Sequence, residues 1–97
     1  MKSPQFTPGP WRTNTSIHPD DQVFSQTDEI IADCKWTNHI PKTREANARL
    51  IAEAPDLLAQ LIDARDLLYV IAHQGNDSVL MTHIGQYDDA IKRATGQ

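Results

Sequence analysis

Pro41 divides the sequence into two parts with different local preferences. Before it, the segment Thr7-Pro8-Gly9-Pro10-Trp11 contains two prolines and a glycine, which fix an extended or turning backbone and exclude a helix. After it, apolar residues recur at helical spacing almost to the C-terminus. The sequence therefore predicts an α+β fold, with residues 1–41 as the β part and residues 42–97 as the helical part.

The β part is predicted to form a small N-terminal antiparallel sheet of about three strands. The candidate strands cover residues 11–15, 22–26 and 29–36. Thr27-Asp28 is the predicted turn between the last two strands, and no crossover of a dozen residues separates them, which excludes a parallel pair. The two-residue period of the third strand places four side chains on one buried face: Ile30, Ala32, Cys34 and Trp36.

The helical part begins with a helix that Pro55 interrupts. Thr43 is the predicted N-cap of this helix. Pro55 lacks a backbone N–H and its ring crowds the preceding turn, so the helix stops or kinks there. Proline in a first turn, followed by Asp56 near the positive end of the helix dipole, also suits the start of a new helix.

The remaining residues predict an antiparallel helical hairpin. The second helix ends at Gly75, and Asp77 or Ser78 caps a third helix that closes at Gly96. A single apolar stripe on the third helix consists of Leu80, Ile84, Tyr87, Ile91 and Ala94.

Length and composition predict a single domain over residues 1–97, with a modest core. Of the 97 residues, 39% are hydrophobic, and a chain of this size leaves much apolar surface uncovered. We therefore expect a homo-oligomer, most simply a dimer across the helices. The longest apolar run, Leu67–Ala72, is far too short for a membrane span, and the N-terminus shows no secretory signal. A lone cysteine, Cys34, fits a reducing compartment.

The charges leave two binding interpretations open beside ordinary solubilising charge. The net charge of −4 disfavours direct binding of duplex DNA through its phosphates. A cationic cluster at the start of the first helix could hold a small anion. The members of this cluster are Lys42, Arg44, Asn47 and Arg49. Trp11 or Trp36 could supply a stacking surface beside the anion, or each could simply be part of the core. Acidic helix faces could instead meet a basic protein; their members are Glu53, Asp56, Asp63, Asp66, Asp88 and Asp89.

The sequence shows no catalytic set, so we expect a protein that is not an enzyme and that needs no cofactor. The four histidines and Cys34 lack the spacing of metal ligands, so no metal site is predicted. Cys34 and His39 are near neighbours, but Cys34 belongs to the apolar face of its strand, where burial opposes thiolate formation.

Two motifs carry a resemblance to known proteins. They are Thr7-Pro8-Gly9-Pro10-Trp11 and the run from Arg44 to Leu58, which reads REANARLIAEAPDLL. Both resemble a widespread group of small phage and prophage proteins of unassigned role. The resemblance covers the chain up to about Leu58, and it implies a bacterial virus and the cytoplasm of its host as the setting.

This setting favours a non-enzymatic protein that counters a bacterial antiviral defence system. Two mechanisms are open: occlusion of a host defence protein, as anti-CRISPR proteins do, and capture of a cyclic nucleotide signal. An accessory protein that acts on host replication or transcription, or within the phage structure, is the alternative.

Overall fold

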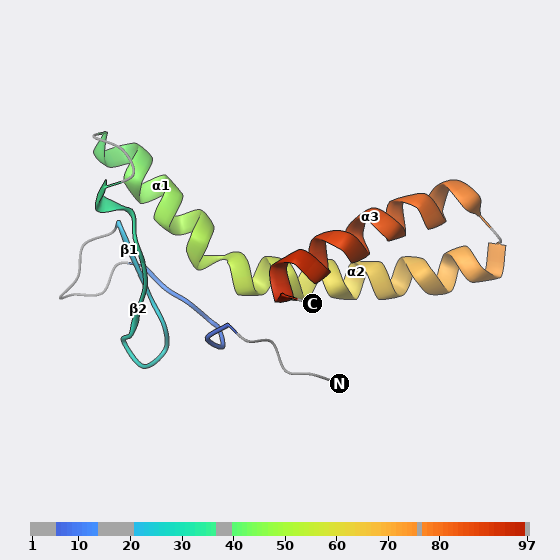
Figure 1. Ribbon diagram of the computed structural model, residues 1–97, viewed down its shortest axis with the longest axis horizontal. Helices are drawn as coiled ribbons and strands as arrows, with labels where there is room; N and C mark the ends of the chain where they lie inside the picture. Colours follow the sequence, from blue (N-terminus) through green and yellow to red (C-terminus); the bar gives the residue numbers. More distant parts are fainter. Residues whose placement is uncertain (1–5, 14–20, 37–39, 76, 97) are drawn as a thin grey trace. The chain divides into compact units, whose positions relative to one another are not determined.

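The computed structural model describes residues 6–13, 21–36, 40–75 and 77–96, and it confirms the α+β class (Figure 1). The elements are β1 (Gln22–Phe24), β2 (Ile30–Asp33), the 3-10 helix η1 (Cys34–Trp36), α1 (Pro41–Ala52), α2 (Ala54–Gly75) and α3 (Ser78–Thr95). They form two compact units, which we describe separately: Thr7–Asp56, and the hairpin from Leu57 onward. The units thus divide at Asp56, whereas the secondary structure changes at Pro41.

The sheet has two named strands where the sequence predicted about three. β1 and β2 pair antiparallel. Of the predicted strand over residues 11–15, the described part contributes one bridge, in which Arg12 and Phe24 exchange backbone hydrogen bonds of 2.8 Å; residues 14 and 15 lie outside the described residues. Backbone and hydroxyl groups of Ser25 close the turn, because the Ser25 Oγ accepts from the N–H groups of Thr27 and Glu29.

A bulge in β2 overturns the predicted alternation of buried residues. Val23 pairs with Ala32 but Phe24 pairs with Ile30, so Ile31 is an extra residue on β2. Ile31 and Ala32 both pack on the core, whereas Ile30 is exposed, contrary to the prediction. The prediction failed at Ile30, because a single inserted residue puts the side chains before it and after it out of the two-residue alternation. Cys34 is buried as predicted, although it begins η1, and the Trp36 side chain lies outside the described part of the structure.

The core of the first unit joins the sheet to α1. Val23, Cys34 and Ala48 are buried at its centre, and Trp11 and Ile51 are among the partly buried side chains packed against them. Gly9 approaches the ring of Pro55, since a Cβ added at Gly9 would lie 2.6 Å from the Pro55 Cβ. The two sequence motifs therefore meet in space, and this contact requires glycine.

Helix boundaries follow local chemistry, with one correction. Pro41 takes the first helical position and Ile40 is the N-cap, so the prediction of Thr43 as N-cap is wrong: proline already fits the first turn without a donor. The N–H groups of Thr43 and Arg44 both donate to the Ile40 carbonyl. The predicted interruption near Pro55 is confirmed, since α1 ends at Ala52 and α2 begins at Ala54.

The hairpin of α2 and α3 is also confirmed, because α3 returns antiparallel beside α2 (Figure 1). The Asp77 carboxylate accepts from the Leu80 N–H at 3.0 Å and caps α3, and Gly96 ends α3 in the left-handed conformation, with φ of 75°. Ala72 of α2 and Ile84 and Ile91 of α3 are its most buried apolar residues.

We predict that Gly9→Ala destabilises the fold by about 1–3 kcal/mol, because the new methyl group would collide with the Pro55 ring. Gly85→Ala is the matched control: nothing lies within 4 Å of its added Cβ, so this change within α3 should stabilise by up to about 1 kcal/mol. Urea unfolding followed by circular dichroism measures both. Equal stability of Gly9→Ala and the wild type would contradict the close approach.

Candidate functional site

The predicted cationic cluster is spread around α1. Arg44 is half-buried and its Nη1 donates to the Lys35 carbonyl at 3.2 Å, while its Nε lies 3.9 Å from the Asp21 carboxylate. Lys42 is exposed and Asn47 is half-buried. Arg49 follows Arg44 by five residues, which turns it about 140° around the helix axis. Arg44 thus contacts η1, and Arg49 points to a different surface.

Arg49 and Trp11 share a groove on the first unit. The groove encloses about 420 Å³ and is lined by Trp11, Arg12, Thr13, Arg49, Ala52 and Glu53. Of the five residues that the sequence proposed as a ligand site, the structure therefore brings Trp11 and Arg49 together, and it adds Arg12 and Thr13.

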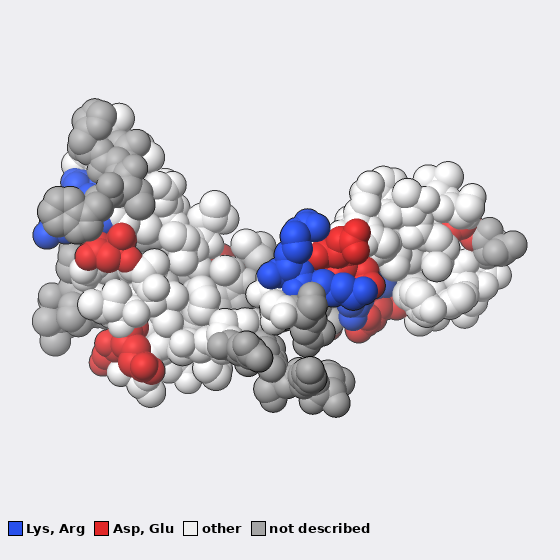
Figure 2. All heavy atoms as spheres, viewed as in Figure 1, with Lys and Arg blue, Asp and Glu red and all other residues white. Residues whose placement is uncertain are grey.

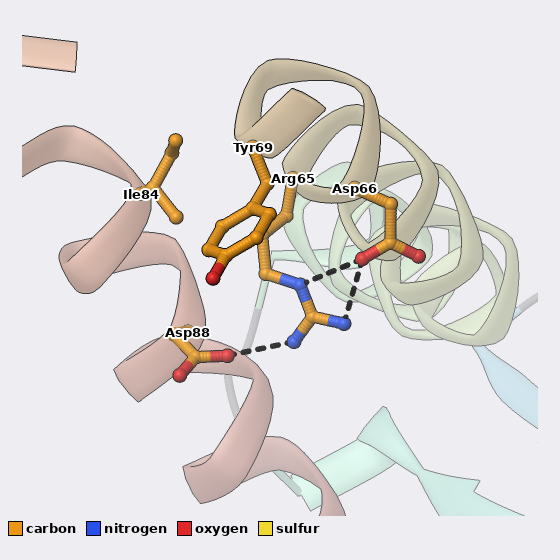
Figure 3. A pocket seen from close by; sticks show the side chains of 5 residues that line it. All are labelled: Arg65, Asp66, Tyr69, Ile84 and Asp88. Carbon is orange, nitrogen blue, oxygen red and sulfur yellow. Dashed lines mark hydrogen bonds and ion pairs between the residues drawn. The ribbon is translucent and has the colours of Figure 1, made fainter. Parts of the chain in front are cut away.

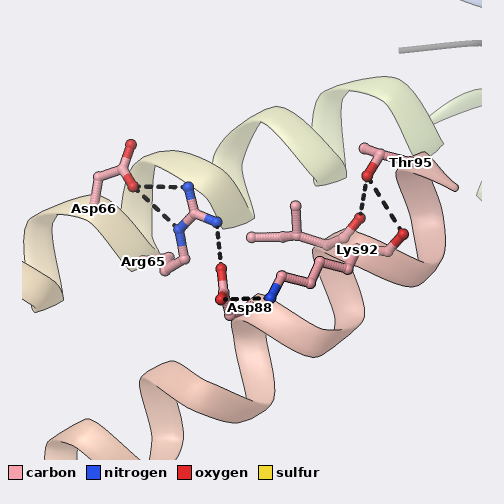
Figure 4. Close-up of polar contacts among 6 residues, drawn as sticks. Arg65, Asp66, Asp88, Lys92 and Thr95 are labelled. Carbon is pink, nitrogen blue, oxygen red and sulfur yellow. Dashed lines mark hydrogen bonds and ion pairs between the residues drawn. The ribbon is translucent and has the colours of Figure 1, made fainter. Parts of the chain in front are cut away.

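Two of the predicted interface acids are neutralised within the hairpin. Arg65 of α2 donates to Asp66 at 3.0 Å and reaches across to Asp88 of α3 at 2.7 Å (Figure 3). Asp88 also lies 3.5 Å from Lys92 (Figure 4). These contacts, above all the hydrogen bond to Asp66, raise the pKa of Arg65 further. A hollow of about 320 Å³ beside them includes Tyr69 and Ile84, but its charges already satisfy one another.

The other four predicted interface acids are exposed: Glu53, Asp56, Asp63 and Asp89. Glu53 and Asp56 belong to the first unit, and Asp63 and Asp89 belong to the hairpin. Figure 2 shows basic and acidic side chains next to each other over part of the hairpin, and mostly uncharged residues toward the end of the hairpin where α2 leads to α3.

The uncharged end of α2 carries large apolar side chains in the open. Leu67, Val70 and Ile71 keep 63%, 55% and 49% of their surface exposed. Their spacing of three and four residues places them on one face of α2. Leu68 and Ala72 lie on another face and are covered. We call this surface the outer face of α2 and define it by Leu67, Val70 and Ile71. Acidic helix faces are one interpretation of the sequence, whereas this face is apolar.

Cys34 lacks the setting of a nucleophile. Its side chain is 1% exposed, and burial, followed by the nearby carboxylates of Asp33 and Asp21, raises the pKa of the thiol. His39, its neighbour in sequence, lies outside the described residues. A protonated, covered sulfur is a poor nucleophile.

Two further classes of site are not found among the described residues. No three histidine, cysteine, aspartate or glutamate side chains in these ranges gather as a metal ion would require. No helix in them is long and apolar enough to cross a membrane.

Sequence reasoning missed Arg65, Tyr69 and Arg12. The signal for Arg65 was present, because it is the one basic residue among the acids of α2 and follows Leu61 by four residues on the covered face. Arg12, which forms an ion pair with Asp28, had no comparable signal, since the pair depends on the strand bridge at Phe24.

We predict that Cys34 gives the folding free energy a pH dependence in the alkaline range. The raised pKa lets the folded chain keep the thiol proton after the unfolded chain has lost it, so stability falls as pH rises past the ordinary thiol value of 9.0. Urea unfolding at about pH 7 and pH 10 measures the free energy of unfolding at each pH. Between these values the wild type should lose more of this free energy than Cys34→Ala does, and the difference should be at most about 1.4 kcal/mol per pH unit above the ordinary thiol pKa. Identical losses would contradict the burial of an unionised thiol.

A comparison with models of known protein families gives a match over the whole sequence. A family model described as Salmonella phage P22 protein Y8K6 matches residues 1–97. No curated protein and no solved structure matches the chain. Because the family model spans the whole sequence, the chain belongs to the Salmonella phage P22 protein Y8K6 family, which makes it a phage protein.

Proposed function

We propose that this phage protein is a non-enzymatic inhibitor of a bacterial antiviral defence system and that it acts by docking on a host protein in the cytoplasm. The observation that carries the proposal is the outer face of α2. Three large apolar side chains stand open there on one side of a regular helix, although exposing them to water is unfavourable.

The chemistry of this face indicates the kind of partner. Exposed apolar residues at spacings of three and four, as Leu67, Val70 and Ile71 have, are typical of a helix that binds in a groove of its receptor. Asp63 precedes Leu67 by four residues and so lies on the same side, where its carboxylate is exposed. The partner therefore offers an apolar groove with lysine or arginine at its edge, and docking blocks that surface of the defence protein.

The remainder of the described structure supports binding over catalysis. The one thiol is buried, and the carboxylates of Asp66 and Asp88 are occupied by Arg65. A general acid or base needs a group that is open to substrate. The homodimer predicted from the sequence would compete for the same face, so the two are separable by experiment.

We expect expression of the chain to raise the plating efficiency of a phage that an active bacterial defence system restricts. The double variant Leu67→Ser/Ile71→Ser should lose this effect by about tenfold or more, because it removes two apolar contacts from the docking face. Its matched control is Ile40→Ser/Leu50→Ser, which changes two equally exposed apolar residues of the other unit and should keep the effect.

Circular dichroism first establishes that both double variants fold. If neither the wild type nor the control changes plating in any of a panel of hosts, each with a different defence system, the inhibitory role is wrong. If both double variants act like the wild type, the outer face of α2 is not the docking surface. A phenotype in hosts without a defence system would instead favour a role in replication or transcription.

A further inference from the structure

We propose that the groove between Trp11 and α1 binds a nucleoside monophosphate. The groove lies entirely within the unit Thr7–Asp56, so this inference does not depend on the docking face of α2. Its volume of about 420 Å³ falls in the range of sites that hold small ligands.

Trp11 provides a fixed aromatic surface. Its indole N–H donates to the Thr7 carbonyl at 3.0 Å, and its ring packs against the core formed by Val23, Cys34 and Ala48. The side chain is only partly buried, so part of it still lines the groove. An aromatic ring held in this way stacks on a base with little loss of side-chain entropy.

Arg49 provides a guanidinium that the described part of the chain does not engage. Its side chain makes no ion pair or hydrogen bond with those residues, even though Glu53, the C-cap residue of α1, follows it by four residues. Arg12 lines the same groove, and its ion pair with Asp28 is between exposed groups, which are weakly held in water. Two guanidinium groups beside one hollow favour a phosphate, which arginine binds through paired hydrogen bonds.

Glu53 narrows the class of ligand. A carboxylate on the wall of the groove repels a bare phosphate, but it accepts hydrogen bonds from hydroxyl or amino groups. Thr13 also lines the groove and carries a hydroxyl that can donate or accept a hydrogen bond. A ligand that interacts with all of these side chains has a flat ring to stack on Trp11, hydroxyl or amino groups to donate hydrogen bonds to Glu53, and a phosphate to pair with Arg49. A nucleoside monophosphate has all three.

Isothermal titration calorimetry of the full chain tests the proposal with the 5′-monophosphates of adenosine, guanosine, cytidine and uridine. We expect at least one to bind, and to bind about tenfold or more weakly to Arg49→Gln. Arg93→Gln removes the same charge from an exposed position in α3 and should leave the affinity unchanged. The parent nucleoside and inorganic phosphate should each bind more weakly than the monophosphate.

Three results would overturn the proposal. They are no binding of any of the four at millimolar concentration, equal weakening by Arg49→Gln and Arg93→Gln, and inorganic phosphate binding as tightly as the nucleotide. The last result would describe an anion site that does not read the ring. Because Arg49 is exposed and unengaged, its substitution should not affect folding, which circular dichroism verifies.

Discussion

The apolar run Leu67–Ala72 constrains the hairpin, because a helix that is apolar on every side needs cover on every side. α3 covers one side, where Ala72 is buried together with Ile84 and Ile91. The described helices of this unit are α2 and α3, and the opposite side of α2 carries the exposed side chains of Leu67, Val70 and Ile71. This exposed face is the basis of the docking that we propose for this phage protein.

Features set by neighbouring residues could be predicted from the sequence. Pro55 interrupts the first helix, and Asp77 and Gly96 cap the third, because each acts on backbone groups within one turn. The error at Thr43 is of the same local kind, since Pro41 competes for the same turn and fits its first position better.

Features set by contacts between distant residues could not be predicted. The bulge at Ile31 depends on how β2 pairs with β1, and it decides whether Ile30 or Ile31 reaches the core. The candidate site behaves in the same way. Trp11 and Arg49 were both proposed from sequence, but only the packing of the N-terminal segment on α1 separates Arg49 from Arg44 and brings it to the tryptophan.

The number of acidic residues could be read from the sequence, but which of them form ion pairs could not. The six proposed interface acids are all present, yet two of them, Asp66 and Asp88, form ion pairs with Arg65, and Asp88 also pairs with Lys92. An acid count therefore overestimates the acidic surface of the hairpin.

The most direct measurement is the reactivity of a cysteine placed at Leu67 in a Cys34→Ala background, with the molecular mass determined on the same sample. The account predicts rapid modification of the isolated protein and protection when the host defence protein is bound. Protection of the isolated protein, with the mass of a dimer, would contradict it, because a second copy of the chain would then already cover the face.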